Sequence, residues 1–355
     1  MFGSILSRYG FDESDFTVRA FGNGLINHTW KIIYAGKEFL LQRINQQVFT
    51  RPGDILDNCS LLAAYFKLNH PGYLFVAPLP ALNHLNYVID DENNYYRLFP
   101  FIKNSYTCNT VSSPALAYEA AKQFGKFTRL LSPFDPALLH TTLPDFHNLS
   151  MRHQQFLQAL ENGSPQRIEK SAESITFLKE QQGIVDRFEK AKNKPSFTQR
   201  VIHHDAKINN VLFDIGTNLG LCVIDLDTVM TGYYISDVGD MLRTYLSPAS
   251  EEVADLSLVQ IREQYFHEIV KGYLGEMLPV LSEEELPYFV YAGKFAIYMQ
   301  AIRFLTDYLN NDRYYLVNYP DQNLVRTNNQ CVLLKKYLEK EHQLDGILEK
   351  YLKEK

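Results

Sequence analysis

Short runs in which apolar and polar residues alternate fill the first hundred positions, a pattern typical of half-buried β-strands. Glycine, asparagine and aspartate separate these runs and favour tight turns between them. The pattern predicts five strands, at 16–21, 27–34, 38–44, 85–89 and 95–99. A small antiparallel sheet is therefore expected at the start of the chain.

Helical spacing of apolar residues interrupts this pattern once and then replaces it. A helix is expected from Pro52, because Ile55, Cys59, Leu62 and Phe66 would lie on one of its faces. Further helices are predicted at 114–131, 151–160, 165–191, 238–246, 256–274 and 289–309, followed by a lysine-rich helical tail from 335. The predicted fold class is α+β.

Length and composition limit what the chain can be. Its 355 residues suggest two domains, expected at 1–102 for the sheet and 103–355 for the mostly helical part. A hydrophobic fraction of 46% is enough for a substantial core, and a net charge of −6 argues against nucleic-acid binding. The four cysteines form no CxxC pair and are expected to be reduced thiols. We find neither a signal-peptide pattern nor an apolar run long enough for a membrane span, so the cytoplasm is the expected compartment.

A β-hairpin is predicted within the larger domain. Apolar runs at 211–213 and 221–224 flank Asp214-Ile-Gly-Thr-Asn-Leu-Gly220, whose residue types favour a turn. Such a hairpin would bring Asn210 and Asp225 together at its open end.

The side chains around this hairpin suit phosphoryl transfer. Asp205 could accept the proton of an attacking hydroxyl, and Lys207 could meet the charge on the moving phosphoryl group. Asn210 and Asp225 offer the oxygen ligands that Mg²⁺ takes beside a triphosphate. Each residue alone could be a turn former, a solvated lysine or a strand cap, but the four at this spacing favour the chemical interpretation. Asp227 could be a second metal-site carboxylate or could bond the turn.

The expected sheet domain offers the parts of a nucleotide site. Gly22 and Gly24 form a turn that suits a lid over phosphates, although ordinary hairpin turns also use glycine. Arg43 on the third strand could bind phosphate bidentately, and an exposed strand arginine is the alternative. Phe99 and Phe101 border an apolar linker where an adenine would sit against backbone groups.

Other acidic residues near the predicted helix starts could have purely structural roles. Asp54 and Asp57 either complement the N-terminus of the helix that starts at Pro52 or orient Arg43. Asp237 or Ser236 is expected to act as the N-cap of the helix predicted at 238–246.

Five segments carry a resemblance to a known family. They are 24–30, 39–45, 203–214, 224–229 and 303–308. The chain resembles, over nearly its whole length, the aminoglycoside-phosphotransferase-type small-molecule kinases, which have a protein-kinase-like fold of two lobes. Within that family it is most similar to kinases of N-acetylhexosamines. This resemblance implies that the enzyme uses ATP and Mg²⁺ to phosphorylate a hydroxyl, the anomeric one, of free N-acetylglucosamine or N-acetylgalactosamine.

The resemblance also implies roles for individual residues. It makes Asp205 the catalytic base with Lys207 near the transferred phosphate, and it makes Asn210 and Asp225 the Mg²⁺ ligands. Around the sugar it implies a set of three further side chains, His28, Arg303 and Tyr314. Of these, only Arg303 could be suspected from the residues alone, because an arginine inside an apolar helix needs a partner. A salt bridge to a nearby carboxylate is the alternative for that arginine.

Two other functions remain as alternatives. The same reaction could use an amino alcohol, homoserine, another sugar or an aminoglycoside as the acceptor. An acidic cluster near the base would favour such cationic acceptors, whereas Arg303 and His28 favour a neutral polyol. A nucleotide-binding regulator without turnover would lack the base or a metal ligand, and the sequence retains both. The expected partners are therefore ATP and a small sugar, without nucleic acid or membrane, while the preferred epimer and the oligomeric state stay open.

Overall fold

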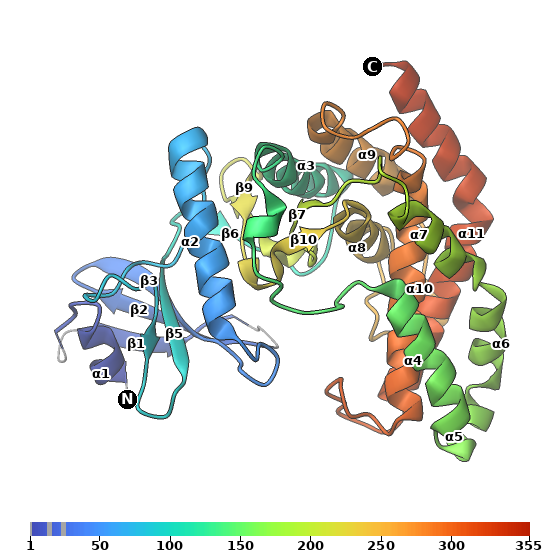
Figure 1. The fold of residues 1–355 in the computed structure, drawn as a ribbon, viewed down its shortest axis with the longest axis horizontal. Coiled ribbons are helices and arrows are strands. Elements are labelled where there is room, and N and C mark those ends of the chain that lie inside the picture. The colour runs from blue at the N-terminus through green and yellow to red at the C-terminus, as the bar shows by residue number, and fades with distance from the viewer. Residues whose placement is uncertain (1, 13–15, 23–25) are drawn as a thin grey trace. The chain divides into compact units, whose positions relative to one another are not determined.

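The computed structural model describes residues 2–12, 16–22 and 26–355 and has the predicted α+β composition (Figure 1). The chain forms two compact units. The first unit comprises Met1–Tyr106, Phe134–Pro144 and Leu212–Thr231, and the second comprises Thr107–Pro133, Asp145–Val211 and Gly232–Lys355. The first carries the small sheet, and the second is mostly helical, as expected. The division at 102/103 stays a prediction, since each unit combines several stretches of the chain.

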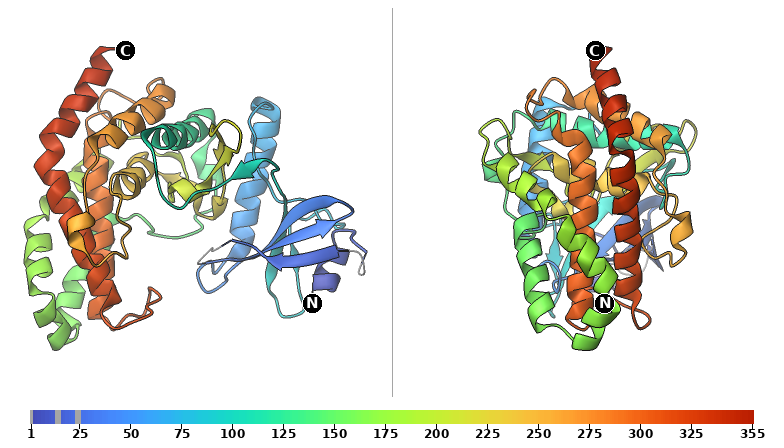
Figure 2. Two further views of the ribbon diagram at one scale, coloured as in Figure 1. Left: turned by 180° about the vertical axis from the view of Figure 1, so that it is seen from behind. Right: turned by 90° about the vertical axis from the view of Figure 1, so that its right-hand side faces the viewer.

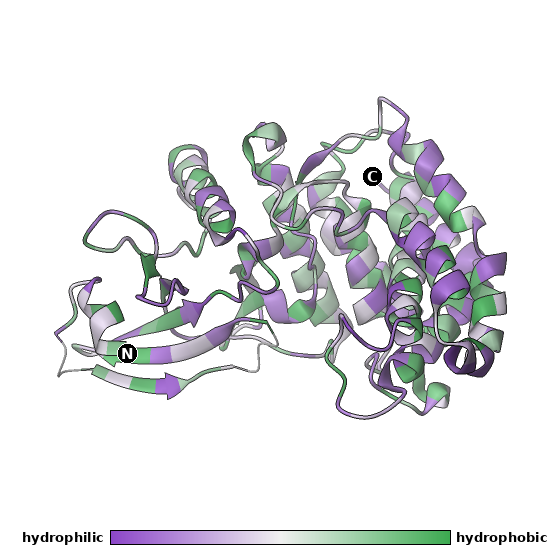
Figure 3. Cartoon of the chain, turned by 60° about the horizontal axis from the view of Figure 1, so that its bottom comes forward, coloured by the Kyte–Doolittle hydropathy of each residue, from purple (hydrophilic) through white to green (hydrophobic). Residues whose placement is uncertain are grey.

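The first unit contains the five predicted strands in one sheet. Their order is β1-β2-β3-β5-β4, and the paired strands run antiparallel. The strands are β1 (Phe16–Ala20), β2 (His28–Tyr34), β3 (Lys37–Arg43), β4 (Val88–Ile89) and β5 (Tyr95–Pro100). The alternation of hydropathy along them, visible in Figure 3, gives the sheet two chemically different faces.

The strand register assigns residues to these faces. Leu41 pairs with Leu98, and the next pair, Gln42 with Arg97, points to the opposite side. The apolar face forms a core with α1 (Phe2–Ser7), and its buried members are Ile5, Leu6, Ile32, Leu41, Ala81, Val88, Tyr96 and Leu98. The other face therefore carries polar side chains in the middle of the sheet.

A helix and a hairpin complete the parts of the first unit that concern the site. The helix α2 (Pro52–Asn69) starts at the predicted proline and buries the predicted face of Ile55, Cys59, Leu62 and Phe66. The predicted hairpin is present as β8 (Val211–Asp214) and β9 (Gly220–Val223), joined by β6 (Ser105–Tyr106) in a three-stranded sheet. Asp214 N–H donates to Leu219 O at 2.9 Å and closes the hairpin turn.

The second unit is built around α10 (Tyr288–Leu309), which is buried along most of its length. Four helices pack against α10, as Figures 1 and 2 show. They are α4 (Leu149–Asn162), α7 (Gly183–Lys192), α8 (Ile235–Tyr245) and α11 (Gln322–Lys353). A second packed pair is α3 (Pro114–Leu130) with α9 (Glu263–Met277). These two helices approach closely where Gly125 faces Tyr273 and Gly272 faces Tyr118, because a Cβ at either glycine would collide with the facing backbone.

The helix predicted at 165–191 is wrong as a single element. The structure has three pieces there, α5 (Pro165–Lys170), α6 (Ala172–Glu180) and α7. At the first break the Ser171 hydroxyl bonds to the carbonyls of Arg167 and Ile168, at 2.7 and 3.3 Å, which is the local competition that serine offers to a helix. The helix predicted at 256–274 also begins later, at Glu263, after a single 3₁₀ turn (Leu256–Leu258). Across the described residues, no helix combines the length and apolarity that a bilayer crossing needs.

Candidate functional site

Three predicted site residues meet in the second unit, in the loop after β7 (Arg200–Ile202). The Asn210 amide nitrogen donates to Asp205 Oδ2 at 2.8 Å and to the Asp205 carbonyl at 2.9 Å. Lys207 Nζ lies 2.9 Å from Asp205 Oδ1. A 3₁₀ turn (Ile208–Asn210) returns the chain so that residue 210 reaches residue 205. We call this group the catalytic loop, and the roles predicted for its members remain predictions.

The contacts in the catalytic loop fix the charges of its members. Burial by itself would raise the pKa of Asp205, but the charge and hydrogen bond of Lys207, together with Asn210, lower it below the ordinary value for aspartate. The Asp205 charge in turn raises the pKa of Lys207. At neutral pH the loop therefore presents an ionised carboxylate and an ammonium side by side.

Asp237 holds the backbone at the start of the catalytic loop, a role that was not predicted from the sequence. Its two carboxylate oxygens accept the backbone N–H groups of His203, at 3.0 Å, and His204, at 2.7 Å. The prediction that Asp237 or Ser236 caps the helix is wrong, because α8 begins at Ile235 and both residues lie inside its first turn, where Asp237 is fully buried. Burial raises its pKa to about 7, against the lowering effect of the two N–H donors. An acidic residue in the first turn of the helix was the only sequence signal.

The predicted Mg²⁺ ligands supply suitable donor atoms. The Asn210 amide nitrogen makes both of its hydrogen bonds to Asp205, and the carbonyl oxygen of the same planar amide is an acceptor that could bind a metal. Asp225 follows β9 in the first unit with a left-handed φ of +60°. No cluster of three His, Cys, Asp or Glu side chains able to hold a metal occurs in the described part of the chain. A carboxylate and an amide oxygen nevertheless fit Mg²⁺, which takes few protein ligands and keeps several waters.

Asp227 is bonded within the first unit. Arg97 Nη2 lies 2.5 Å from its Oδ1, and the Asn27 amide nitrogen donates to its Oδ2 at 2.7 Å. The Asn27 carbonyl oxygen accepts the Asn45 N–H at 2.9 Å, so the carboxylate is linked to the chain after β3. Gln42 accepts from Arg97 Nε at 2.9 Å. These contacts join Asp227 to β5 and to the chain before β2 and not to its own turn, and a metal role for Asp227 remains a prediction.

Arg43, the cation predicted to bind phosphate, lies on the opposite face of the sheet from the ion pair of Arg97 and Asp227. Arg43 pairs with Tyr96 and His28, on the face of the sheet that carries Leu41, and not on the face of Arg97. Arg97 was not among the predicted site residues, although an arginine in an apolar strand indicates a buried partner. The two carboxylates considered as partners of Arg43 lie near other groups. Asp54 is 3.0 Å from Arg51, and Asp57 is 3.7 Å from His140. The phosphate role of Arg43 stays a prediction.

The predicted nucleotide residues lie around cations of the first unit. Lys31 Nζ is 4.0 Å from the centre of the Phe101 ring, and the Arg97 guanidinium is 5.2 Å from that of Phe99. Phe21 meets Phe101 edge to face at 5.8 Å. Gly22 has a φ of +76°, which glycine adopts without strain. Gly24 lies outside the described residues.

Two of the three predicted sugar contacts share the second unit with Asp205. Arg303 on α10 is half-buried, and within the described part of the chain no carboxylate lies within 4.0 Å of it. Its guanidinium instead faces rings, at 5.3 Å from Phe146, 5.8 Å from Tyr314 and 5.7 Å from Tyr315. The salt-bridge alternative for Arg303 is thus not what the structure shows. The third contact, His28, stacks on Trp30 at 6.1 Å in the first unit.

A buried carboxylate holds the loop that carries Tyr314. Asp307, one turn after Arg303 on α10, accepts the N–H groups of Arg313 and Tyr314, each at 2.8 Å, and of Tyr315 at 2.9 Å. The Tyr314 ring itself is 65% exposed. Asp307 therefore fixes the loop and is not free to neutralise the neighbouring arginine.

A second arginine lies near Arg303. Burial, and next the charge of Arg303, lower the pKa of Arg152 on α4. Arg152 donates to the neutral Gln155 at 3.1 Å, and its buried Nε has no hydrogen-bond partner among the described residues. We refer to Arg152, Arg303, Phe146, Tyr314 and Tyr315 as the acceptor surface, a cationic and aromatic group of side chains.

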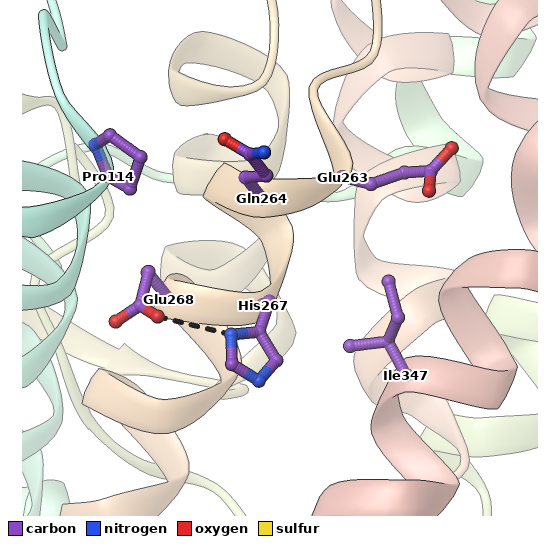
Figure 4. A pocket seen from close by; sticks show the side chains of 6 residues that line it. All are labelled: Pro114, Glu263, Gln264, His267, Glu268 and Ile347. Atoms are coloured by element: carbon purple, nitrogen blue, oxygen red, sulfur yellow. Dashed lines mark hydrogen bonds and ion pairs between the residues drawn. The ribbon is translucent and has the colours of Figure 1, made fainter.

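Two recesses of the second unit lie elsewhere. One, of about 410 Å³, is shown in Figure 4 and is lined by Pro114, Glu263, Gln264, His267, Glu268 and Ile347. Its acidic groups have partners, since His267 Nδ1 lies 3.1 Å from Glu268 and Glu263 pairs with Lys340. The other, of about 600 Å³, lies along α4 and α7 and includes Asp145 and Asn148. Neither recess contains a residue predicted for catalysis or sugar binding.

Comparison with known proteins connects this geometry to a family. The model of the phosphotransferase enzyme family matches residues 17–267. A solved microcompartment-associated aminopropanol kinase is 16% identical, covers 96% of this chain and 97% of its own, and has a TM-score of 0.66. A spectinomycin phosphotransferase in complex with ADP and spectinomycin is 13% identical, covers 95% of each chain and has a TM-score of 0.56.

A choline kinase from Cryptosporidium parvum is 16% identical, covers 95% of this chain and 93% of its own, and has a TM-score of 0.53. At such identities the solved structures show a common fold, with a small antiparallel sheet and a larger helical part. They do not transfer an acceptor to this chain.

Proposed function

Because the chain belongs to the phosphotransferase enzyme family, we propose that it transfers the terminal phosphoryl group of ATP to a hydroxyl of a free N-acetylhexosamine. The hydroxyl in this proposal is the anomeric one at C1, and N-acetylglucosamine and N-acetylgalactosamine are the two acceptors considered. The reaction class follows from the family and from the catalytic loop, and the sugar is the finer part of the proposal.

The contact of Asp205 with both Lys207 and Asn210 is the observation that carries the reaction. Asp205 is ionised at neutral pH and can accept the proton of the acceptor hydroxyl as the oxygen attacks. Lys207, at 2.9 Å from that carboxylate, orients it and adds positive charge where the phosphoryl group moves. Phosphoryl transfer needs little covalent help from the protein, so positioning and charge of this kind supply most of the catalysis.

The catalytic loop is also suited to hold a metal ion. Asn210 in this loop and Asp225 in the first unit are the predicted ligands of Mg²⁺, which when bound neutralises charge on the triphosphate. The hydrogen bonds from the Asn210 amide nitrogen to Asp205 hold the amide in one orientation, so that the base and the metal ligand are positioned together.

The charge of the acceptor surface supports a neutral acceptor. Among the described residues no carboxylate lies within 4.0 Å of Arg152 or Arg303, and the nearby Asp307 accepts three backbone N–H groups. Two guanidinium groups would repel a quaternary ammonium or a protonated amine. They are good donors to the hydroxyl and amide oxygens of an N-acetylated sugar, and the exposed Tyr314 ring offers an apolar face to a pyranose.

The proposal is tested by ADP release from the purified protein with Mg²⁺ and ATP. The acceptors are N-acetylglucosamine, N-acetylgalactosamine, their unacetylated amines, galactose, ethanolamine, choline and homoserine. We expect turnover with the N-acetylated sugars and little with the amino alcohols, and phosphorus NMR should place the new ester at C1. Turnover confined to amino alcohols would refute the sugar assignment, and no turnover with any acceptor in the panel would refute the proposed reaction.

A further inference from the structure

His204, the residue before Asp205, has a backbone conformation that glycine adopts most easily. Its φ is +65°, in the left-handed region where the Cβ of an L-residue comes too close to the following carbonyl oxygen. This turn directs two successive N–H groups, of His203 and His204, at the carboxylate of Asp237. A glycine would make the same turn with less strain, so the backbone alone does not account for a histidine here.

The imidazole of His204 is held tightly on two sides. The side chain is almost fully buried, and its Nδ1 lies 3.2 Å from the carbonyl oxygen of Ile202, to which an Nδ1–H donates. The other nitrogen lies against Gly232, where an added Cβ would come within 2.3 Å of Nε2 and 2.6 Å of Cε1. Any larger residue at position 232 would displace the ring. The ring therefore has one well-defined position beside the catalytic loop.

A row of rings leads from His204 to the acceptor surface. The His204 and His147 rings are 5.4 Å apart, and His147 stacks on Phe146 at 4.5 Å with an angle of 15° between the rings. The Arg303 guanidinium lies 5.3 Å from the Phe146 ring. Burial, and next the neighbouring His204 and Arg303, hold the pKa of His147 well below its usual range, so His147 is neutral at pH 7. The row thus connects the residue next to the base with a cation of the acceptor surface.

We propose that His204 is a positioning residue that couples the catalytic loop to the acceptor surface and thereby selects the acceptor. Its ring supports the stacked pair of Phe146 and His147, which in turn supports Arg303. An acceptor bound against Arg303 then presents its hydroxyl at a fixed distance from Asp205. The proposal rests on the proposed function, since it takes Asp205 as the base and Arg303 as an acceptor contact.

The test measures steady-state kinetics of two substitutions that remove the ring. His204→Gly relieves the backbone strain, and His204→Asn retains a residue that tolerates a left-handed φ. In both we expect kcat/KM for the best acceptor of the panel to fall about 10- to 100-fold, as for other small misplacements of reacting groups, with KM for ATP nearly unchanged. The preference for that acceptor over ethanolamine should fall as well. Gly232→Ala, which displaces the ring without removing it, should change the same parameters in the same direction.

His84→Gly is the matched control, because His84 is also a histidine at a positive φ, +66°, but is exposed in a turn of the first unit. It should leave the kinetics unchanged. A His204→Gly enzyme with the acceptor kcat/KM and selectivity of the wild type would overturn the proposal. Equal losses for ATP and for the acceptor would also overturn it, since they indicate a general loosening. Absence of turnover in the wild type would refute the proposed function and not the role of His204, and it would be seen before any substitution is made.

Discussion

Arg97 and Asp227 form an ion pair in the interior of the first unit, with 2.5 Å between Arg97 Nη2 and Asp227 Oδ1 and side chains that are 2% and 3% exposed. Gln42 and Asn27 bond to the two partners and satisfy further donors and acceptors. A buried pair of this kind stabilises a fold only when both members and their hydrogen bonds are present, because each charge left alone in the interior is unfavourable.

Removing Arg97 should destabilise the protein strongly. Arg97→Met leaves the Asp227 charge buried without its cation, and we expect the free energy of unfolding to fall by about 3–5 kcal/mol in urea titrations. Arg19→Met, an exposed arginine of the same sheet, should change it by less than about 0.5 kcal/mol. The double variant Arg97→Met with Asp227→Leu should recover much of the loss, and a single Arg97→Met variant as stable as the wild type would show that the pair is unimportant.

Substitution of the base should abolish turnover and leave the fold intact. Asp205→Asn keeps the size of the side chain but cannot accept the proton, so we expect kcat to fall by about 10²–10⁴-fold. Thermal melting and ATP binding, measured by calorimetry, should stay close to those of the wild type. Asp91→Asn, at a fully exposed aspartate, serves as the control. Near-normal kcat in Asp205→Asn would exclude this residue as the base.

The pH dependence should reveal the influence of Lys207 on Asp205. The lowered pKa of Asp205 keeps the base ionised well into the acid range, so kcat/KM of the wild type should decline only below the ordinary pKa of aspartate. Lys207→Met removes the neighbouring charge, and the acid limb of the profile should move to higher pH. Lys207→Arg retains a cation and should keep the limb near its wild-type position. An unchanged limb in Lys207→Met would show that the ion pair does not control this titration.

The raised pKa of Asp237 should make the folded protein less stable as pH rises. Its pKa is near 3.8 in the unfolded chain and about 7 in the fold, so between these values the folded protein binds one proton more. The free energy of unfolding should therefore decrease by a few kcal/mol in total as pH rises from about 4 to about 7. Above pH 7 this contribution to the slope should disappear. Asp237→Asn should remove this component of the slope. Urea titrations at several pH values measure it, and identical slopes in both proteins would contradict the raised pKa.

Asp307 should control acceptor binding through the loop it holds. Asp307→Asn offers one acceptor oxygen where the carboxylate offers two, so the N–H groups of Arg313, Tyr314 and Tyr315 cannot all be satisfied. We expect a loss of about 1.5–3 kcal/mol in stability and a higher KM for the acceptor with KM for ATP unchanged. Asp312→Asn is a control on the same loop, since Asp312 bonds Arg167 and Asn323 but no N–H of the tyrosines. Equal effects of the two substitutions on KM would argue against a specific role of Asp307.

Local patterns along the chain were enough to predict the strands of the small sheet, most of the helices and the residues of the catalytic loop. Periodicity of apolar residues is a local property, and so is the spacing of Asp205, Lys207 and Asn210, which lie within one short loop whose turn brings them together. Their meeting could be anticipated because few backbone conformations connect residues so close in the chain.

The distant groups that these elements face could not be predicted from local patterns, because they depend on how the chain packs. The register of the sheet places Arg97, and not Arg43, on the side of Gln42, and the packing of α8 turns Asp237 from an expected cap into the support of the catalytic loop. The helix predicted at 165–191 is three helices, and at the first break the bond from the Ser171 hydroxyl to the backbone outweighs a continuous apolar pattern. Buried polar groups take partners from whatever part of the chain the fold brings near, and that choice is not encoded in the local pattern around either partner.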